Sequence, residues 1–249
     1  PLAIHSDCSK LTFIGLCNLI AGIENSLKLS QLSLLISNLP GISEMNFLQC
    51  LQLIFINPRL THLKLILPAT PIISEDGLSH LASSIKQSKQ HLQGLELYFM
   101  KGENLTAKGF IKLCEGLQTL ENLEFLHIII GDKVPNVSDR GFYSLIEAIS
   151  KFNKLNSLKI ELPEARITSE PLSLFSKTLS SSSKYCFLKE LGLNLAWSLI
   201  SDSSLVEFSE CLSGLLYLEN FYVNLQACSI SNESLVSLAR GGISKLLLN

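Results

Sequence analysis

The feature that most constrains this chain is a two-part pattern that returns about every 31 residues. The first part runs aliphatic, Ser or Thr, two variable residues, a small residue and then Leu or Phe. Its copies begin at Leu11, Ile42, Ile73, Leu105, Val137, Ile167, Ile200 and Ile230. The second part reads L-x-x-L-x-L-x-L. Its copies begin at Leu29, Leu60, Leu92, Leu123, Leu155, Leu188, Leu218 and Ile243. A repeat of this length predicts a solenoid, in which each unit stacks on its neighbours.

Each repeat is expected to contain one helix and one strand. In the second part the apolar residues alternate with a period of two, as in a strand that buries one face. In the first part they follow helical spacing, as Phe142, Leu145, Ile146 and Ile149 do. The Ser or Thr stands where its hydroxyl would cap the first turn of the helix. These expected capping residues are Thr12, Ser43, Ser74, Thr106, Ser138, Thr168, Ser201 and Ser231.

The spaced leucines and the capped helices together resemble the leucine-rich repeat family, in particular its ribonuclease-inhibitor-like class. The resemblance covers residues 11–249. It implies an α/β solenoid, a horseshoe of about eight repeats with a parallel sheet on the concave face and helices on the convex face. One position departs from the family pattern. The usual Asn at the ninth position of the strand phrase is replaced by residues such as Met100, Gly131 and Ala196. The eighth position is apolar instead, which predicts a strand one residue longer and a less regular turn.

The domain organisation follows from the repeat. Residues 1–249 are expected to form a single array, because the pattern runs through essentially the whole chain. Neither end carries an obvious polar capping unit, which solenoids need at free ends, so we expect a fragment of a longer protein.

Composition narrows the setting. The hydrophobic fraction of 47% predicts an ordered core, and the net charge of −2 gives no argument for nucleic acid as a partner. No stretch is apolar and long enough to predict a transmembrane segment. The seven cysteines show no metal-binding spacing, and their odd number favours reduced thiols. We therefore expect an intracellular, cytoplasmic protein, with a cytoskeletal, ciliary or organellar assembly as a further setting.

The outward-facing strand positions predict the binding face. Their middle column is apolar in its first four members and polar in the rest: Leu35, Ile66, Tyr98, Ile129, Glu161, Asn194 and Asn224. Beside it runs a mixed column that includes Lys64, Glu96, His127, Lys159 and Tyr222. An exposed apolar stripe with a polar margin is typical of a surface that binds a protein. The alternative is that an extension or loop of the same protein covers the stripe.

A second candidate patch lies on the early helices. Phe13, Met45, Leu48 and Phe55 are apolar residues beyond the expected buried stripe of their helices. Either a partner or further N-terminal repeats would cover them. Trp197 follows a strand phrase, and two interpretations stay open: an exposed contact residue, or the commoner ring tucked over the end of the core.

No motif points to catalysis or to a bound cofactor. The five histidines share no neighbourhood in the repeat, and no phosphate loop, dinucleotide fingerprint or metalloprotease motif is present. We therefore expect no enzyme activity, cofactor, metal or small-molecule substrate. The expected function is non-catalytic: a protein–protein interaction module or structural scaffold subunit of a larger complex. The alternative is a sensor or adaptor arm of a larger regulatory protein, such as a ligase adaptor, a GTPase regulator or a kinase-linked protein. A secreted receptor ectodomain is the third interpretation, and it would require cysteines that are paired in disulfide bonds.

Overall fold

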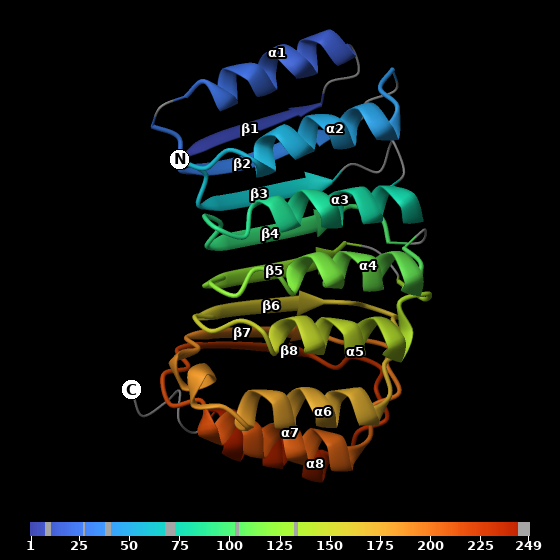
Figure 1. Cartoon of the computed structure of the whole chain (residues 1–249). Coiled ribbons are helices and arrows are strands. Elements are labelled where there is room, and N and C mark those ends of the chain that lie inside the picture. Colours follow the sequence, from blue (N-terminus) through green and yellow to red (C-terminus); the bar gives the residue numbers. More distant parts are fainter. Residues whose placement is uncertain are drawn as a thin grey trace.

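Strands and helices alternate along the chain in the computed structural model (Figure 1). The model describes residues 1–7, 11–26, 28–37, 41–67, 73–102, 105–131 and 134–243, without the side chains of residues 6–7, 36–37 and 242–243. The described strands are β1 (Leu2–Asp7), β2 (Gln31–Ser37), β3 (His62–Leu67), β4 (Gly94–Phe99), β5 (Phe125–Ile130), β6 (Ser157–Glu161), β7 (Glu190–Asn194) and β8 (Asn220–Asn224). The described helices are α1 (Phe13–Glu24), α2 (Glu44–Phe55), α3 (Glu75–Gln87), α4 (Ala107–Leu117), α5 (Ser138–Ile149), α6 (Ser169–Ser180), α7 (Asp202–Gly214) and α8 (Asn232–Leu238), with a 3₁₀ helix over Ser183–Phe187 and a π-helical turn over Ala239–Ile243.

The strands form one parallel sheet. Among the described residues it has eight strands in sequence order, from β1 to β8, and it stays open rather than closing into a barrel. The described helices lie together on one face of this sheet, and none of them lies on the other face (Figure 1). The predicted α/β fold with a solenoid-like repeat is therefore confirmed.

The free face of the sheet is concave. Lys64 of β3 and Tyr222 of β8 line the same hollow of about 690 Å³. Five strand spacings of a flat sheet would separate these strands by roughly 24 Å. β3 and β8 can line one hollow because the sheet bends toward this face. Such bending is expected for an array whose outer layer consists of helices, which are wider than strands.

The first strand is absent from the sequence prediction. β1 pairs with β2 in the same register that the later strands follow, with Leu2 opposite Leu32 and Ile4 opposite Leu34. The pattern does not identify β1, because Leu2 aligns with the second leucine of the phrase and no leading leucine precedes it in the sequence. At the other end, Ile243 closes the π-helical turn, and the strand predicted to follow it lies outside the described residues.

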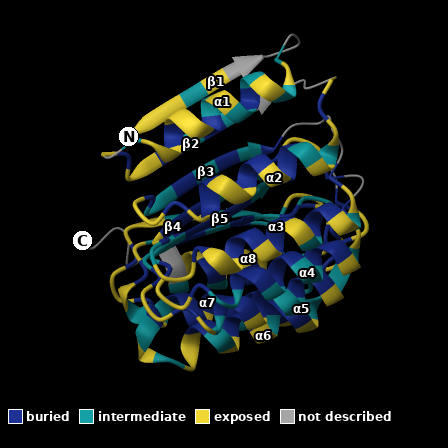
Figure 2. Ribbon diagram, turned by 45° about the horizontal axis from the view of Figure 1, so that its top comes forward, coloured by how far each residue is buried: buried dark blue, intermediate teal, exposed yellow. Residues whose placement is uncertain are grey.

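One continuous core lies between the sheet and the helices. It extends from Leu16 in α1 to Leu238 in α8. Figure 2 shows buried residues through the strands and on the inner faces of the helices. Exposed residues lie along β1 and on the outer faces of the helices. Each large apolar side chain that becomes fully buried, such as Leu97 or Phe110, contributes about 1.5–3 kcal/mol. The core is shared between repeats, so each repeat depends on its neighbours.

The hydroxyl caps are largely as predicted. In five helices the Ser or Thr accepts a hydrogen bond from a backbone N–H of the first turn; these residues are Thr12, Ser43, Ser74, Thr106 and Ser231. Thr168 and Ser201 hold the cap position without that bond, because their hydroxyls bond instead to Asp139 and Ser169 of the preceding repeat. The prediction for Ser138 is wrong: α5 begins at Ser138 itself, after a turn that ends at the cap residue Val137.

The turns after β6 and β7 are joined to the next repeat by backbone hydrogen bonds. Glu164 and Trp197 occupy equivalent positions with left-handed φ values of 59° and 61°. Their N–H groups donate to the carbonyls of Ala196 and Gln226 in the next repeat, at 2.9 and 2.7 Å. The longer strand that the apolar eighth position predicts is present in β3, β4 and β5. The prediction of a longer strand is wrong for β6, β7 and β8. Each of these strands ends one residue earlier, where the regular turn begins.

Candidate functional site

The concave face of the sheet carries three columns of side chains. The pairing places Leu35 beside Ile66, Ile66 beside Tyr98 and Tyr98 beside Ile129. All four side chains are partly exposed, so they form one continuous half-buried surface, which we call the apolar stripe. The column continues through three polar, partly exposed residues: Glu161, Asn194 and Asn224. The predicted middle column is therefore confirmed as a row on one face.

The predicted neighbouring column also lies on this face. The register aligns its members Lys64, Glu96, His127, Lys159 and Tyr222. Tyr222 is 51% exposed, whereas His127 is only 5% exposed. The expectation that His127 presents a contact surface is therefore wrong. Its ring lies against Phe125, with the ring centroids 3.9 Å apart, and Ser157 covers its Nε2 edge.

A third column completes the face, and the sequence prediction missed it. Its members precede those of the second column by two residues and have the same parity along each strand: Gln31, His62, Gly94, Phe125, Ser157, Glu190 and Asn220. The period of two that identified the other columns could have found it. Its most consequential member is Glu190, which organises the polar part of the face.

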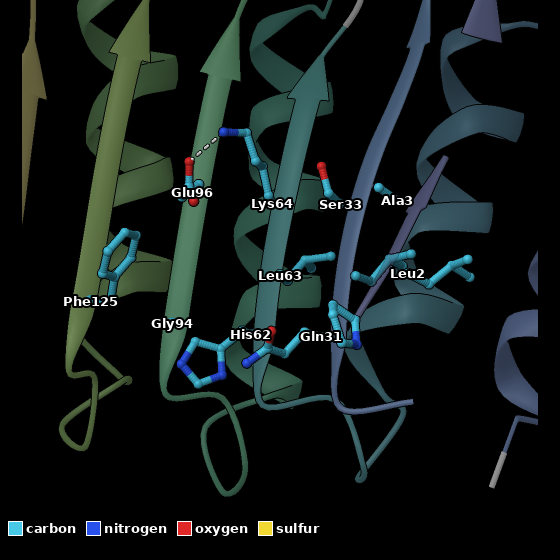
Figure 3. A pocket seen from close by; sticks show the side chains of 12 residues that line it. Leu2, Ala3, Gln31, Ser33, His62, Leu63, Lys64, Gly94, Glu96 and Phe125 are labelled. Carbon is cyan, nitrogen blue, oxygen red and sulfur yellow. Dashed lines mark ion pairs between the residues drawn. The ribbon is translucent and has the colours of Figure 1, made fainter. Parts of the chain in front are cut away.

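A network of hydrogen bonds surrounds Glu190. Lys159 Nζ lies 2.6 Å from Glu190 Oε1, and the Ser157 hydroxyl donates to Oε2 at 2.6 Å. His127 Nε2 lies 3.0 Å from Ser157 Oγ. Because the serine gives its proton to the carboxylate, the histidine N–H is the donor in that contact. On the other side of the histidine, Lys64 forms an ion pair with Glu96 at 2.8 Å (Figure 3).

The network determines the protonation states of its members. Burial alone would raise the pKa of Glu190, but the hydrogen bonds from Lys159 and Ser157 outweigh it and lower that pKa. Burial, reinforced by the charge of Lys159, lowers the pKa of His127 to about 4. Near neutral pH the carboxylate is therefore charged and the imidazole is neutral.

The contacts of Ser157 and His127 differ from those of an activated nucleophile. A histidine that activates a serine must accept its proton, whereas here Glu190 Oε2 accepts it. The other ring nitrogen, Nδ1, is 3.9 Å from Glu96 Oε2, which is beyond hydrogen-bonding distance. In this arrangement Ser157 donates to the carboxylate of Glu190 rather than to His127, and the hydrogen bonds fix the positions of the charged side chains along the face.

Two hollows flank this network. The polar hollow, of about 690 Å³, includes Lys159, Glu161 and Tyr222 in its lining. The apolar hollow, of about 390 Å³, lies toward the first strands (Figure 3). It is lined chiefly by Leu2, Ala3, Leu32, His62, Leu63, Gly94 and Phe125. A Cβ atom on Gly94 would come within 2.4 Å of the His62 ring, so the absence of a side chain there leaves room for that ring.

The predicted second patch does not form a continuous surface. Leu48 and Phe55 are 3% and 1% exposed, so their prediction as contact residues is wrong. An inner helix of the array has a helical neighbour on each side, and α2 therefore buries a wider stripe than one face of a lone helix would. Phe13 is half-buried and packs against the core. Met45 is exposed, at 42%.

Trp197 lies in the turn after β7, and its side chain is 56% exposed. The favoured interpretation, a ring tucked over the end of the core, is wrong. The left-handed backbone of this turn directs the side chain outward, while Ala196 beside it is buried.

The described residues form neither a cluster suited to a metal ion nor a helix suited to a membrane span. No three His, Cys, Asp or Glu side chains in that part of the chain gather closely enough to hold a metal ion. None of the described helices has the length and apolar character needed to cross a bilayer.

Comparison with known proteins gives no assignment. No family model and no curated protein matches the chain. Among solved structures, it is similar to a Bacteroides fragilis protein whose crystal structure was a structural-genomics target. The two are 14% identical, the match covers 90% of this chain and 67% of the other, and the TM-score is 0.45. A likeness at this level supports no conclusion about function.

Proposed function

We propose that this chain is a leucine-rich repeat array that binds a protein partner through the concave face of its sheet. Two observations support the family assignment: the repeated leucine phrase of the sequence, and the open parallel sheet with all described helices on one face. The proposed role is that of an interaction or scaffold subunit rather than of an enzyme.

The apolar stripe is the observation that carries the proposal. Ile66, Tyr98 and Ile129 stand on three adjacent strands, about 4.8 Å apart, and each is partly exposed. Apolar side chains gathered in this way lose water contact when a partner covers them, and each contributes to the binding free energy. The polar side chains on either side would form the rim of such an interface.

The charges beside the stripe indicate the chemistry of the partner. Lys64 is paired with Glu96, and Lys159 is paired with Glu190. Glu161, which continues the stripe directly after Ile129, has no cationic partner among the described residues. Within the described part of the chain, the face therefore presents an apolar row followed by a carboxylate without a cationic partner. A complementary partner segment would place apolar side chains on the row and a Lys or Arg beside Glu161.

Affinity capture followed by mass spectrometry tests the proposal. The test variant combines Ile66→Glu, Tyr98→Glu and Ile129→Glu. The matched control, Leu174→Glu with Val206→Glu and Val236→Glu, places the same number of charges on helix residues that are 41%, 36% and 48% exposed. Circular dichroism must first show that both variants are folded. We expect a partner that is captured by wild type and by the control and lost with the test variant. Equal capture by all three proteins would contradict binding through the stripe.

A charge exchange then tests the predicted partner chemistry. We expect Glu161→Lys to weaken the affinity about tenfold at low salt, with a smaller effect at high salt. Replacing the facing Lys or Arg of the partner by Glu should restore affinity to the Glu161→Lys variant. Failure of every such exchange to restore binding would exclude Glu161 as the site of the cationic contact.

A further inference from the structure

Two cysteine sulfurs lie in contact between the first two helices. Cys17 Sγ in α1 is 3.9 Å from Cys50 Sγ in α2, and both are free thiols. A disulfide bond is about 2.05 Å long, so the sulfurs must approach by roughly 1.9 Å to be joined. Rotation about the Cα–Cβ bonds can move a sulfur by this distance.

The two thiols differ in their access to solvent. Cys17 is partly exposed, whereas Cys50 is 2% exposed. Cys17 is therefore the more accessible of the two thiols, and we expect a small molecule in solution to react with it first. Cys114 in α4 offers a comparison within the same fold, because it is completely buried at the equivalent layer between helices and sheet.

We propose that Cys17 and Cys50 are a modification site at which a low-molecular-weight disulfide forms a reversible disulfide bond between α1 and α2. The site is separate from the concave face, since both residues lie on helices. Disulfide formation at this site can therefore be tested independently of partner binding at the concave face.

The reaction consists of two exchange steps. The Cys17 thiolate attacks one sulfur of the disulfide RSSR, the S–S bond breaks, and RS⁻ leaves and takes a proton from water. Cys50 then gives its proton to a solvent base, and its thiolate attacks the Cys17 sulfur of the mixed disulfide and releases the second RS⁻. Two protein thiols are oxidised to one disulfide, and RSSR is reduced to two RSH.

The relative rates follow from burial. Burial and the neighbouring Cys17 thiol raise the pKa of Cys50 to about 12, so its thiolate is scarce near neutral pH. The second step is therefore the slower one, and the Cys17 mixed disulfide should accumulate transiently. The completed bond ties together residues 33 positions apart and restrains the opening of α1 at the end of the described array.

Peptide mapping of the full chain tests this site. The chain is incubated with mixtures of oxidised and reduced glutathione and digested with trypsin without reduction. Trypsin cuts after Lys10, Lys28 and Arg59, so Cys8, Cys17 and Cys50 fall on three different peptides. We expect a linked pair of the peptides 11–28 and 29–59, with Cys114 unmodified. Hydrogen exchange within residues 13–24 should slow about tenfold in the oxidised protein.

Three cysteine variants test which thiol reacts in each step. Cys8→Ser should still form the linked pair, Cys50→Ser should stop at a glutathione adduct on Cys17, and Cys17→Ser should form neither. Cys50→Ala serves in place of Cys50→Ser if the serine variant is unfolded by circular dichroism. A wild-type chain that stops at the adduct, or that links either cysteine to a different one, would overturn the proposal.

Discussion

Asp139, in the first turn of α5, accepts two hydrogen bonds from Thr168 in the next repeat. The Thr168 N–H donates to Oδ1 at 2.8 Å, and its hydroxyl donates to Oδ2 at 2.7 Å. Asp202 repeats the arrangement: its Oδ1 accepts from the Ser231 N–H and from the Ser234 hydroxyl, both at 2.7 Å. A carboxylate of one repeat therefore holds the start of the following helix, and these bonds couple the helices as the sheet couples the strands.

Replacing this carboxylate should weaken the array. We expect Asp139→Ala to lower the free energy of unfolding by about 2 kcal/mol, because two charge-assisted hydrogen bonds are lost and the Thr168 N–H loses its partner. Urea unfolding followed by circular dichroism measures the change. The control is Glu147→Ala on the exposed side of the same helix, with an expected change within about 0.5 kcal/mol. Equal effects of the two substitutions would show that the carboxylate is not needed.

The low pKa of His127 makes stability depend on pH. The unfolded chain protonates this histidine near pH 6.5, and the folded chain does so only near pH 4, so between these values the unfolded state binds more protons. Stability therefore falls as the pH is lowered from 6.5 toward 4. Between pH 7 and pH 5 we expect His127 to account for a loss of about 2 kcal/mol.

The variant His127→Gln tests this dependence by urea unfolding at both pH values. It should lose less stability than wild type between pH 7 and pH 5, because its side chain does not titrate. A smaller dependence should remain, since burial also lowers the pKa of His91. The exposed His80 provides the control, and His80→Gln should keep the full wild-type dependence. An unchanged pH dependence in His127→Gln would contradict the assignment.

The close approach of α3 and α4 depends on a glycine. A Cβ atom on Gly116 would lie 2.8 Å from both the Cα and the carbonyl oxygen of Ala82, so backbone would have to move. We expect Gly116→Ala to lower the free energy of unfolding by about 1–3 kcal/mol. Gly22 in α1 has nothing within 4 Å of the same atom. Gly22→Ala should therefore raise stability by about 0.5–1 kcal/mol. Chemical denaturation of both variants checks the opposite signs, and a stabilising Gly116→Ala would contradict the packing.

Much of the fold could be predicted from the sequence because the repeat determines strand register. Once the leucines of adjacent phrases are aligned, Ile66 must stand between Leu35 and Tyr98, and the structure places it there. Hydroxyl caps are also predictable, since they depend on residues within one turn of each other. The contacts of Asp139, in contrast, could not be predicted from the sequence of one repeat. The helix dipole explains an acidic residue at that place, but its bonds to Thr168 depend on how two repeats stack.

Parts of the site could not be predicted for similar reasons. The burial of His127 depends on side chains of three strands at once: Phe125 beside it, Ser157 of the next strand and Glu190 of the one after. Leu48 is buried because α2 has helices on both sides, which the periodicity of one helix does not reveal. The environments of His127 and Leu48 are made by several repeats together, and the sequence of one repeat does not contain them.

The most direct measurement on the proposed function is site-specific photocrosslinking. A benzophenone amino acid is placed at Tyr98 on the apolar stripe or, as the control, at Met45 on the exposed side of α2. Each protein is irradiated in the presence of the captured partner. We predict that the position of Tyr98 forms a covalent adduct, that excess unlabelled wild-type protein competes it away, and that the position of Met45 forms none. An adduct at Met45 with none at Tyr98 would contradict binding through the concave face.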